Sequence, residues 1–249
     1  MGLKRLTSIA RYLSWTSPIY KWKIRKNECP LCGKNFFIYF DNYPFMIRCL
    51  KCKNTVVNLS VIPVVKEHAN GDYNRAVYEM SSYGATLDFL KRHFEKVVES
   101  EYFPSEKMGD YVNGILNQDI QNLTFSDNSF DIITSNQVFE HVEHDIKGFA
   151  ECYRVLKKDG ALIFTVPLYQ TEKTIQKAST VNGEVVFDGE PEYHDSRIGG
   201  AKSAPVFYRY STNDICERVK SVGFQSVEFR EIYIAKKQKE PQLVVYAKK

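Results

Sequence analysis

Short hydrophobic runs alternate with amphipathic segments from about residue 75 to the end of the chain. Residues 75–80, 96–103, 111–119 and 161–168 are short and largely apolar, which is typical of strands, and residues 129–139 contain another strand that runs into a helix. Residues 85–94, 140–156 and 211–224 place apolar side chains at helical spacing, as with Leu87, Leu90 and Phe94. This alternation predicts an α/β fold in which a doubly wound, mainly parallel sheet has helices on both faces.

The last two hydrophobic runs follow one another without a helix between them. Residues 226–235 and 241–249 therefore predict an antiparallel pair at one edge of the sheet. Residues 157–160, "KKDG", predict a turn before the strongest strand, and Ser211 or Thr212 is expected to cap the last helix.

Four of the six cysteines form two C-x2-C pairs in the first quarter of the chain. Cys29 and Cys32 are separated from Cys49 and Cys52 by residues 33–48, close to the spacing of a structural zinc site. The intervening aromatic and polar residues alternate and predict a hairpin. We expect a small zinc ribbon over residues 27–60 with structural Zn²⁺, because four protein ligands leave no open position. Two disulfides or free thiols are the alternative.

The segment 1–26 is basic, with apolar residues at helical spacing between Leu3 and Leu13. A helix here would lie either on a membrane surface or partner, or on the chain's own domain. No run approaches the roughly 18 apolar residues of a membrane span, and a signal-peptide core is missing. The expected location is the cytoplasm, and the net charge of +4 neither requires nor excludes nucleic acid.

Acidic residues stand at the ends of three expected strands. They are Glu79, Glu101 and Asp119. Ligands of doubly wound sheets bind beyond the carboxyl ends of the strands, so these acids are candidate cofactor ligands.

The block 117–167 resembles class I S-adenosylmethionine-dependent methyltransferases, especially their small-molecule branch. The similar features are an acid followed by "LTFSDNSFD", the "FEHV" helix start, the "RVLKKDGAL" turn and a strand that ends in proline. The resemblance covers residues 70–249 and implies a seven-stranded, Rossmann-like methyltransferase domain with S-adenosylmethionine as cofactor. It also implies an insertion at about 169–210 that covers the substrate.

The resemblance implies roles for individual residues. Glu79 would order the glycine loop and the methionine amino group, and Glu101 would accept hydrogen bonds from both ribose hydroxyls. Asp119 would meet the adenine amino group, with Ile120 packed on the ring. Asn136, in the segment 135–137, would lie near the sulfonium.

The expected cofactor loop has one glycine where the family usually has three. It reads "EMSSYGA" over residues 79–85, with Ser81 and Gly84 at small-residue positions. Serine retains the backbone N–H donors, whereas Tyr83 must point away from the ligand or lie flat along it. We interpret this segment as a variant cofactor loop that functions.

The methyl acceptor is expected to meet the insertion, where His194 stands beside Tyr193 and Asp195. His194 can act as a base near neutral pH, and His141 of "FEHV" is a second candidate. A solvent-exposed or structural histidine is the alternative in each case.

The preferred function is O-methylation of a sugar, a glycan precursor or a related small molecule. An RNA methyltransferase that uses the ribbon to hold RNA is a second possibility, favoured by Lys21, Lys23, Arg25 and Lys26. A non-catalytic, methyltransferase-like binding module is a third, suggested by Tyr83 and the missing glycines.

Overall fold

A computed structural model describes residues 22–196 and 198–249. The expected helix of the segment 1–26 lies almost entirely outside the described residues. Within the described ranges no helix is long and apolar enough to cross a membrane.

The predicted central sheet is present and has eight strands in the order β17-β18-β9-β8-β4-β5-β7-β6. Its strands are β4 (Ala76–Glu79), β5 (Lys96–Glu101), β6 (Tyr111–Val112), β7 (Ile115–Asn117), β8 (Phe130–Asn136), β9 (Leu156–Thr165), β17 (Ser226–Ile232) and β18 (Gln242–Lys248). The five strands from β7 to β9 in this order are parallel, and β18 is antiparallel to both of its neighbours. The fold class is confirmed, and the strand beyond the expected seven is the two-residue β6.

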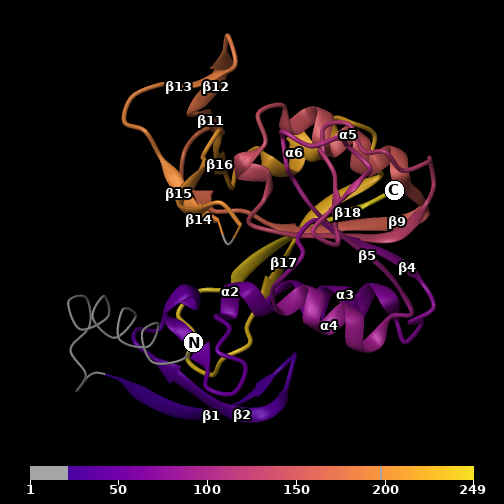
Figure 1. Ribbon diagram of the computed structural model, residues 1–249. Helices are drawn as coiled ribbons and strands as arrows, with labels where there is room; N and C mark the ends of the chain where they lie inside the picture. The colour runs from indigo at the N-terminus through magenta and orange to yellow at the C-terminus, as the bar shows by residue number, and fades with distance from the viewer. Residues whose placement is uncertain (1–21, 197) are drawn as a thin grey trace.

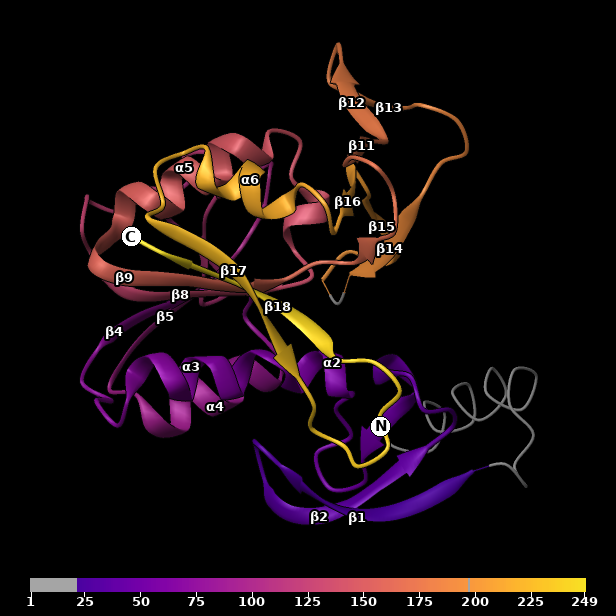
Figure 2. The ribbon, with the colours of Figure 1, turned by 180° about the vertical axis from the view of Figure 1, so that it is seen from behind.

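Helices cover both faces of this sheet, as Figures 1 and 2 show. The helices on one face are α2 (Val56–Leu59), α3 (Val61–Ala69) and α4 (Ala85–His93). Those on the other are α5 (Asp145–Val155) and α6 (Ile215–Lys220), and a 3-10 turn, η3 (Phe139–His141), precedes α5. Each face therefore has its own buried cluster of apolar side chains.

The cysteine-rich segment forms a three-stranded antiparallel sheet, which includes the predicted hairpin. Its elements are β1 (Lys23–Cys29), β2 (Gly33–Tyr39), β3 (Ile47–Cys49) and the 3-10 turn η2 (Pro44–Met46). Phe37 and Ile47 of this sheet are buried in the same cluster as Ile163 and Val244 of the central sheet. The ribbon therefore shares a core with the larger sheet.

The expected insertion consists of short strands that project from one end of the central sheet (Figure 1). They are β10 (Leu168–Tyr169), β11 (Ile175–Gln176), β12 (Ala178–Val181), β13 (Glu184–Phe187), β14 (Tyr193–Ser196), β15 (Gly200–Pro205) and β16 (Tyr208–Ser211). The strand β16 pairs with β10 and β11, whereas β12 with β13 and β14 with β15 form separate hairpins.

Three local predictions were wrong. The expected strand 111–119 is a hairpin, because Asn113 and Gly114 both adopt positive φ (52° and 82°), as a two-residue turn requires. The "KKDG" segment lies within β9, where the register with β8 shifts. The N-cap of α6 is Asp214, because the chain is still extended in β16 at Ser211.

Candidate functional site

The carboxyl ends of adjacent parallel strands bring the predicted cofactor residues to one edge of the sheet. Glu79 ends β4, Glu101 ends β5 and Asn136 ends β8, while Asp119 follows the end of β7 by two residues. These four strands pair in the order β8-β4-β5-β7. The sheet therefore aligns the four predicted residues along one edge, where doubly wound folds bind ligands.

Glu101 holds the variant loop in place. Its Oε1 accepts hydrogen bonds from the backbone N–H of Ser82 at 2.8 Å and from the Ser82 hydroxyl at 2.9 Å. The hydroxyl of Ser81 donates to the same oxygen at 3.4 Å. Ser82 was not among the predicted site residues, although its position next to Ser81 in the loop was visible in the sequence. The serines thus tie the loop to β5.

Glu79 is fully buried at the end of β4, with 1% of its surface exposed. Its Oε2 accepts a hydrogen bond from the Thr134 hydroxyl at 2.5 Å. Burial, opposed by the hydrogen bond from Thr134 and reinforced by the nearby charge of Glu101, raises the pKa of Glu79 to about 8. Glu79 is therefore a carboxyl that a positively charged neighbour would ionise.

Gly84 is needed for its backbone conformation. Its φ is 116° at the N-cap of α4, whereas a Cβ added there would meet nothing within 4 Å. The side chain of Tyr83, the main departure from the family pattern, is exposed at the surface of the loop (37% exposed). The turn thus retains a glycine at the position whose dihedral angles exclude other residues.

Asp119 and Ile120 follow β7. The Oδ1 of Asp119 accepts from the backbone N–H of Gln121 at 2.8 Å and from its side-chain amide at 3.1 Å. Ile120 is buried, and its Cγ1 would lie 3.2 Å from a Cβ added at Gly148 in α5. Ile120 therefore belongs to the core beneath the site, and its contact with adenine stays a prediction.

The end of β8 carries buried polar atoms without partners. Asn136 Oδ1 accepts from the Thr165 hydroxyl at 2.9 Å, whereas Asn136 Nδ2 and Ser135 Oγ have no hydrogen-bond partner among the described residues. Buried polar groups are rarely left unpaired, so a polar ligand at this point would satisfy them.

Both candidate catalytic histidines lie together, although 53 positions separate them in the sequence. His194 Nδ1 in β14 is 3.2 Å from His141 Nε2 in η3. The carboxylate of Glu140 is within 3.9 Å of both nitrogens, and Glu140 is fully buried. Glu140 was not among the predicted residues, although it stands beside His141 in the quoted "FEHV" segment.

Burial shifts the pKa of two members of the cluster formed by Glu140, His141 and His194, which we call the Glu-His-His cluster. It raises the pKa of Glu140 to about 8 and lowers the pKa of His141 to about 4. His141 Nδ1 is 2.7 Å from the carbonyl oxygen of Pro205, to which it donates. The neutral ring therefore presents the lone pair of Nε2 to the cluster.

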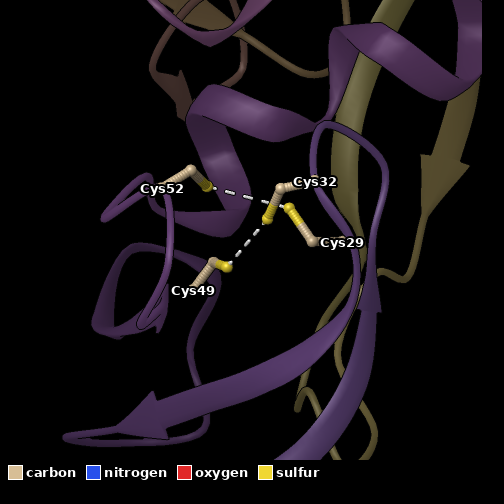
Figure 3. A group of neighbouring side chains, drawn as sticks. All are labelled: Cys29, Cys32, Cys49 and Cys52. Carbon is tan, nitrogen blue, oxygen red and sulfur yellow. Dashed lines mark hydrogen bonds between the residues drawn. The ribbon is translucent and has the colours of Figure 1, made fainter.

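The four cysteines of the ribbon converge, as Figure 3 shows. Their sulfur atoms all lie within 4.8 Å of one another, with 3.7 Å between Cys29 and Cys52 and 3.5 Å between Cys32 and Cys49. A disulfide requires about 2.05 Å, so the thiols are free here. A tetrahedral ion with Zn–S bonds of about 2.3 Å would hold its sulfurs about 3.8 Å apart. The four cysteines therefore fit a zinc ion.

Comparisons with known proteins agree with this architecture. Residues 69–164 match a family model described as a methyltransferase domain. An S-adenosylmethionine-dependent methyltransferase from Mesorhizobium loti superposes with a TM-score of 0.51 at 15% identity, over 76% of this chain and 98% of that one. This likeness shows the fold.

A second solved structure is less similar. It is the 1,6-didemethyltoxoflavin-N1-methyltransferase of Burkholderia thailandensis with 1,6-didemethyltoxoflavin and S-adenosylhomocysteine bound. Its TM-score is 0.48 at 12% identity, over 78% of each chain. No curated protein matches the sequence. The family match spans β4 to β9 and includes the predicted cofactor edge, but not the ribbon or His194.

Proposed function

We propose that the chain is an S-adenosylmethionine-dependent methyltransferase of the class I fold and that it methylates an oxygen atom of a sugar, a glycan precursor or another small molecule. The observation that carries the proposal is the sheet edge at which Glu79, Glu101 and Asn136 end neighbouring parallel strands. We place the enzyme in the cytoplasm, whose reducing conditions keep thiols free.

We assign S-adenosylmethionine to this edge because the side chains suit its parts. The three bonds from the serine loop all fall on Oε1 of Glu101, and we assign Oε2 to the ribose hydroxyls. Glu79 would face the methionine amino group, whose positive charge favours the ionised carboxyl. The unpaired amide of Asn136 would meet the polar end of the cofactor.

The adenine would lie between the loops that follow β5 and β7. Asp119 is the proposed acceptor for its amino group, and Ile120 forms part of the apolar surface below. A carboxylate already oriented by Gln121 needs little reorganisation to accept one more hydrogen bond.

S-adenosylmethionine supplies an activated methyl group, whose carbon–sulfur bond breaks with its electron pair on sulfur as the acceptor oxygen bonds to carbon. The protein contributes mainly alignment, which can supply several kcal/mol, and a group that accepts the hydroxyl proton. We propose His194 and His141 as the acceptor-activating residues, because both belong to the cluster that joins the insertion to η3.

The insertion suits a hydroxyl-rich acceptor. The guanidinium of Arg209 lies 5.3 Å from the ring centre of Tyr169, and its Nε donates to Glu192 at 2.8 Å. Charged and aromatic side chains of this kind can hydrogen-bond and stack on a sugar. This supports a sugar or glycan precursor within the small-molecule class.

We further propose that Cys29, Cys32, Cys49 and Cys52 hold structural Zn²⁺. Four protein ligands complete a tetrahedral shell, so this ion would stabilise the ribbon without reaching a substrate.

Calorimetric titration with S-adenosylhomocysteine tests the cofactor site. The wild-type chain should bind, and Glu101→Gln should weaken binding by about 10–100-fold, because it removes one charge-assisted acceptor. Glu99→Gln is the matched control on the same strand, since Glu99 pairs with Lys91 at the surface. No binding at millimolar ligand would overturn the proposal.

A transfer assay tests the acceptor class. Labelled S-adenosylmethionine is offered with monosaccharides, nucleotide sugars, phenols and structured RNA, and label should appear on a sugar. His194→Ala should then reduce transfer by about 10²–10⁴-fold, the range for loss of an acid–base group. Transfer to RNA alone, with steeply salt-dependent binding, would favour the RNA methyltransferase instead.

A further inference from the structure

The Glu-His-His cluster contains a fully buried carboxylate without a hydrogen-bond partner. Both oxygens of Glu140 are unpaired among the described residues, and none of the residue's surface is exposed. An ionised carboxyl in such a place is costly unless a cation or hydrogen-bond donors compensate for it. The feature therefore points to a missing partner.

The neighbouring histidines do not provide that partner by hydrogen bonding. Glu140 Oε1 lies 3.8 Å from His141 Nε2 and 3.9 Å from His194 Nδ1, beyond the range of about 2.7–3.2 Å for N–H···O bonds. A proton relay through the carboxylate would need shorter contacts. Atoms bound to one shared ion, in contrast, lie this far apart.

The three atoms surround a point that suits a metal ion. Their separations of 3.2, 3.8 and 3.9 Å give a common centre about 2.1 Å from each atom, and Zn–N and Zn–O bonds are about 2.0–2.2 Å. We propose that Glu140 Oε1, His141 Nε2 and His194 Nδ1 bind one divalent transition-metal ion.

The surroundings of His141 prepare it to be a ligand. Its Nδ1 donates to the Pro205 carbonyl at 2.7 Å, which fixes the ring and leaves Nε2 unprotonated. Histidine ligands of metals characteristically donate their other ring N–H in this way. Pro205 lies on β15, the partner strand of His194, so one hairpin supplies both a ligand and the group that orients another ligand.

The ligand set indicates the class of ion and its use. Two imidazoles and one carboxylate suit Zn²⁺, Fe²⁺ or Co²⁺ better than Mg²⁺, which prefers oxygen ligands. Three protein ligands leave coordination positions open, as in catalytic sites. If the proposed function holds, these positions would take the acceptor's hydroxyl, whose pKa the ion would lower so that its proton passes to solvent water, and the two rings would serve as ligands in place of proton acceptors.

Metal content and spectroscopy test the site in the full chain. The protein is depleted of metal under reducing conditions and titrated with Co²⁺, and a bound thiolate set is recognised by its charge-transfer absorption. We expect two ions per chain: one with thiolate bands from the ribbon, and one with only the weak visible bands of nitrogen and oxygen ligands.

Variants test which residues bind the second ion, the one without thiolate ligands. His194→Ala and the isosteric Glu140→Gln should each lower the affinity for this ion by at least about 100-fold, because even the loss of an outer-shell partner lowers metal affinity by about 10–100-fold. Neither change should alter the thiolate bands. The control is His144→Ala, whose exposed imidazole lies three residues after His141 in the same segment and which should retain both ions. Circular dichroism checks that each variant is folded.

The outcomes separate this proposal from the proposed function. A wild-type chain that binds only the ion with thiolate bands, or a His194→Ala variant that retains the ion without them at unchanged affinity, overturns the metal site. Titration of the same samples with S-adenosylhomocysteine reports on the cofactor edge independently. A chain that binds two ions but no S-adenosylhomocysteine would contradict the proposed function and support the metal site.

Discussion

The two clusters of side chains that we propose as metal sites differ in composition and in how the chain assembles them. The ribbon combines four identical ligands from residues 29–52, whereas the Glu-His-His cluster combines three ligands of two kinds from residues 140–141 and 194. A complete tetrahedral set suits a structural ion, and an incomplete, mixed set suits chemistry on a bound molecule. The comparison suggests that the ribbon stabilises the fold and that the other cluster acts on the acceptor.

The largest expected effect is on the ribbon. Cys49→Ser should lower the free energy of unfolding by at least about 3 kcal/mol, because it removes one proposed zinc ligand and Cys49 is fully buried in the core shared with the central sheet. Denaturant unfolding followed by circular dichroism measures this. Cys216→Ser, at a half-buried thiol in α6, should cost less than about 1 kcal/mol. Equal stability of the two variants would contradict a structural ion in the ribbon.

A second test uses Glu79, a buried carboxyl that, unlike Glu140, accepts a hydrogen bond. Its pKa of about 8 lies above its ordinary value of 4.5, so between these pH values the folded chain retains a proton that the unfolded chain has released. This raised pKa therefore makes stability decrease as pH rises from about 4.5 to 8. Glu79→Gln lacks this titrating group, so its stability should rise relative to that of wild type by on the order of 4 kcal/mol between pH 5 and pH 9.

Denaturant unfolding of the cofactor-free, metal-depleted chain at several pH values measures the difference. A constant gap between Glu79→Gln and wild type would show that Glu79 titrates normally. The result also serves as a reference for Glu140 of the Glu-His-His cluster. Both carboxyls are fully buried, but Glu79 accepts a hydrogen bond from Thr134, whereas the oxygens of Glu140 have no partner among the described residues.

The smallest effect on stability is expected at His194. Its side chain is 37% exposed, and it belongs to a projecting hairpin. His194→Ala should change the free energy of unfolding by less than about 1 kcal/mol in metal-depleted protein. Denaturant unfolding of His194→Ala and Cys49→Ser under the same conditions compares their losses of stability. A large loss in His194→Ala would instead indicate a structural role for His194.

The sequence predicted those features whose signal is local. The α/β alternation gave the order of the main strands and helices, and the C-x2-C spacing located the ribbon cysteines. The strand ends at Glu79 and Glu101 followed from the same pattern, whereas Asp119, which we expected to end a strand, lies two residues beyond β7. Where a local signal was overlooked, as with Asn113 and Gly114, the error was also local.

Features that depend on distant contacts were harder to predict. Both histidines were candidates, yet nothing in the sequence indicates that a strand at 193–196 returns to a turn at 139–141. Glu140 could be recognised only once its burial and its unpaired oxygens were known. The shared core of the ribbon and the sheet likewise depends on α2 and α3, which pack between them and were not predicted.

The loop between β17 and β18 extends from the sheet edge to the ribbon. The backbone N–H of Lys236 donates to Asn27 Oδ1 and its carbonyl accepts from the Tyr39 hydroxyl, both at 2.8 Å. The ribosome makes the ribbon about 200 residues before Lys236, so these bonds cannot form until synthesis has passed this loop. A nascent chain whose ribbon has already folded therefore still lacks the hydrogen bonds that connect the ribbon to the loop between β17 and β18.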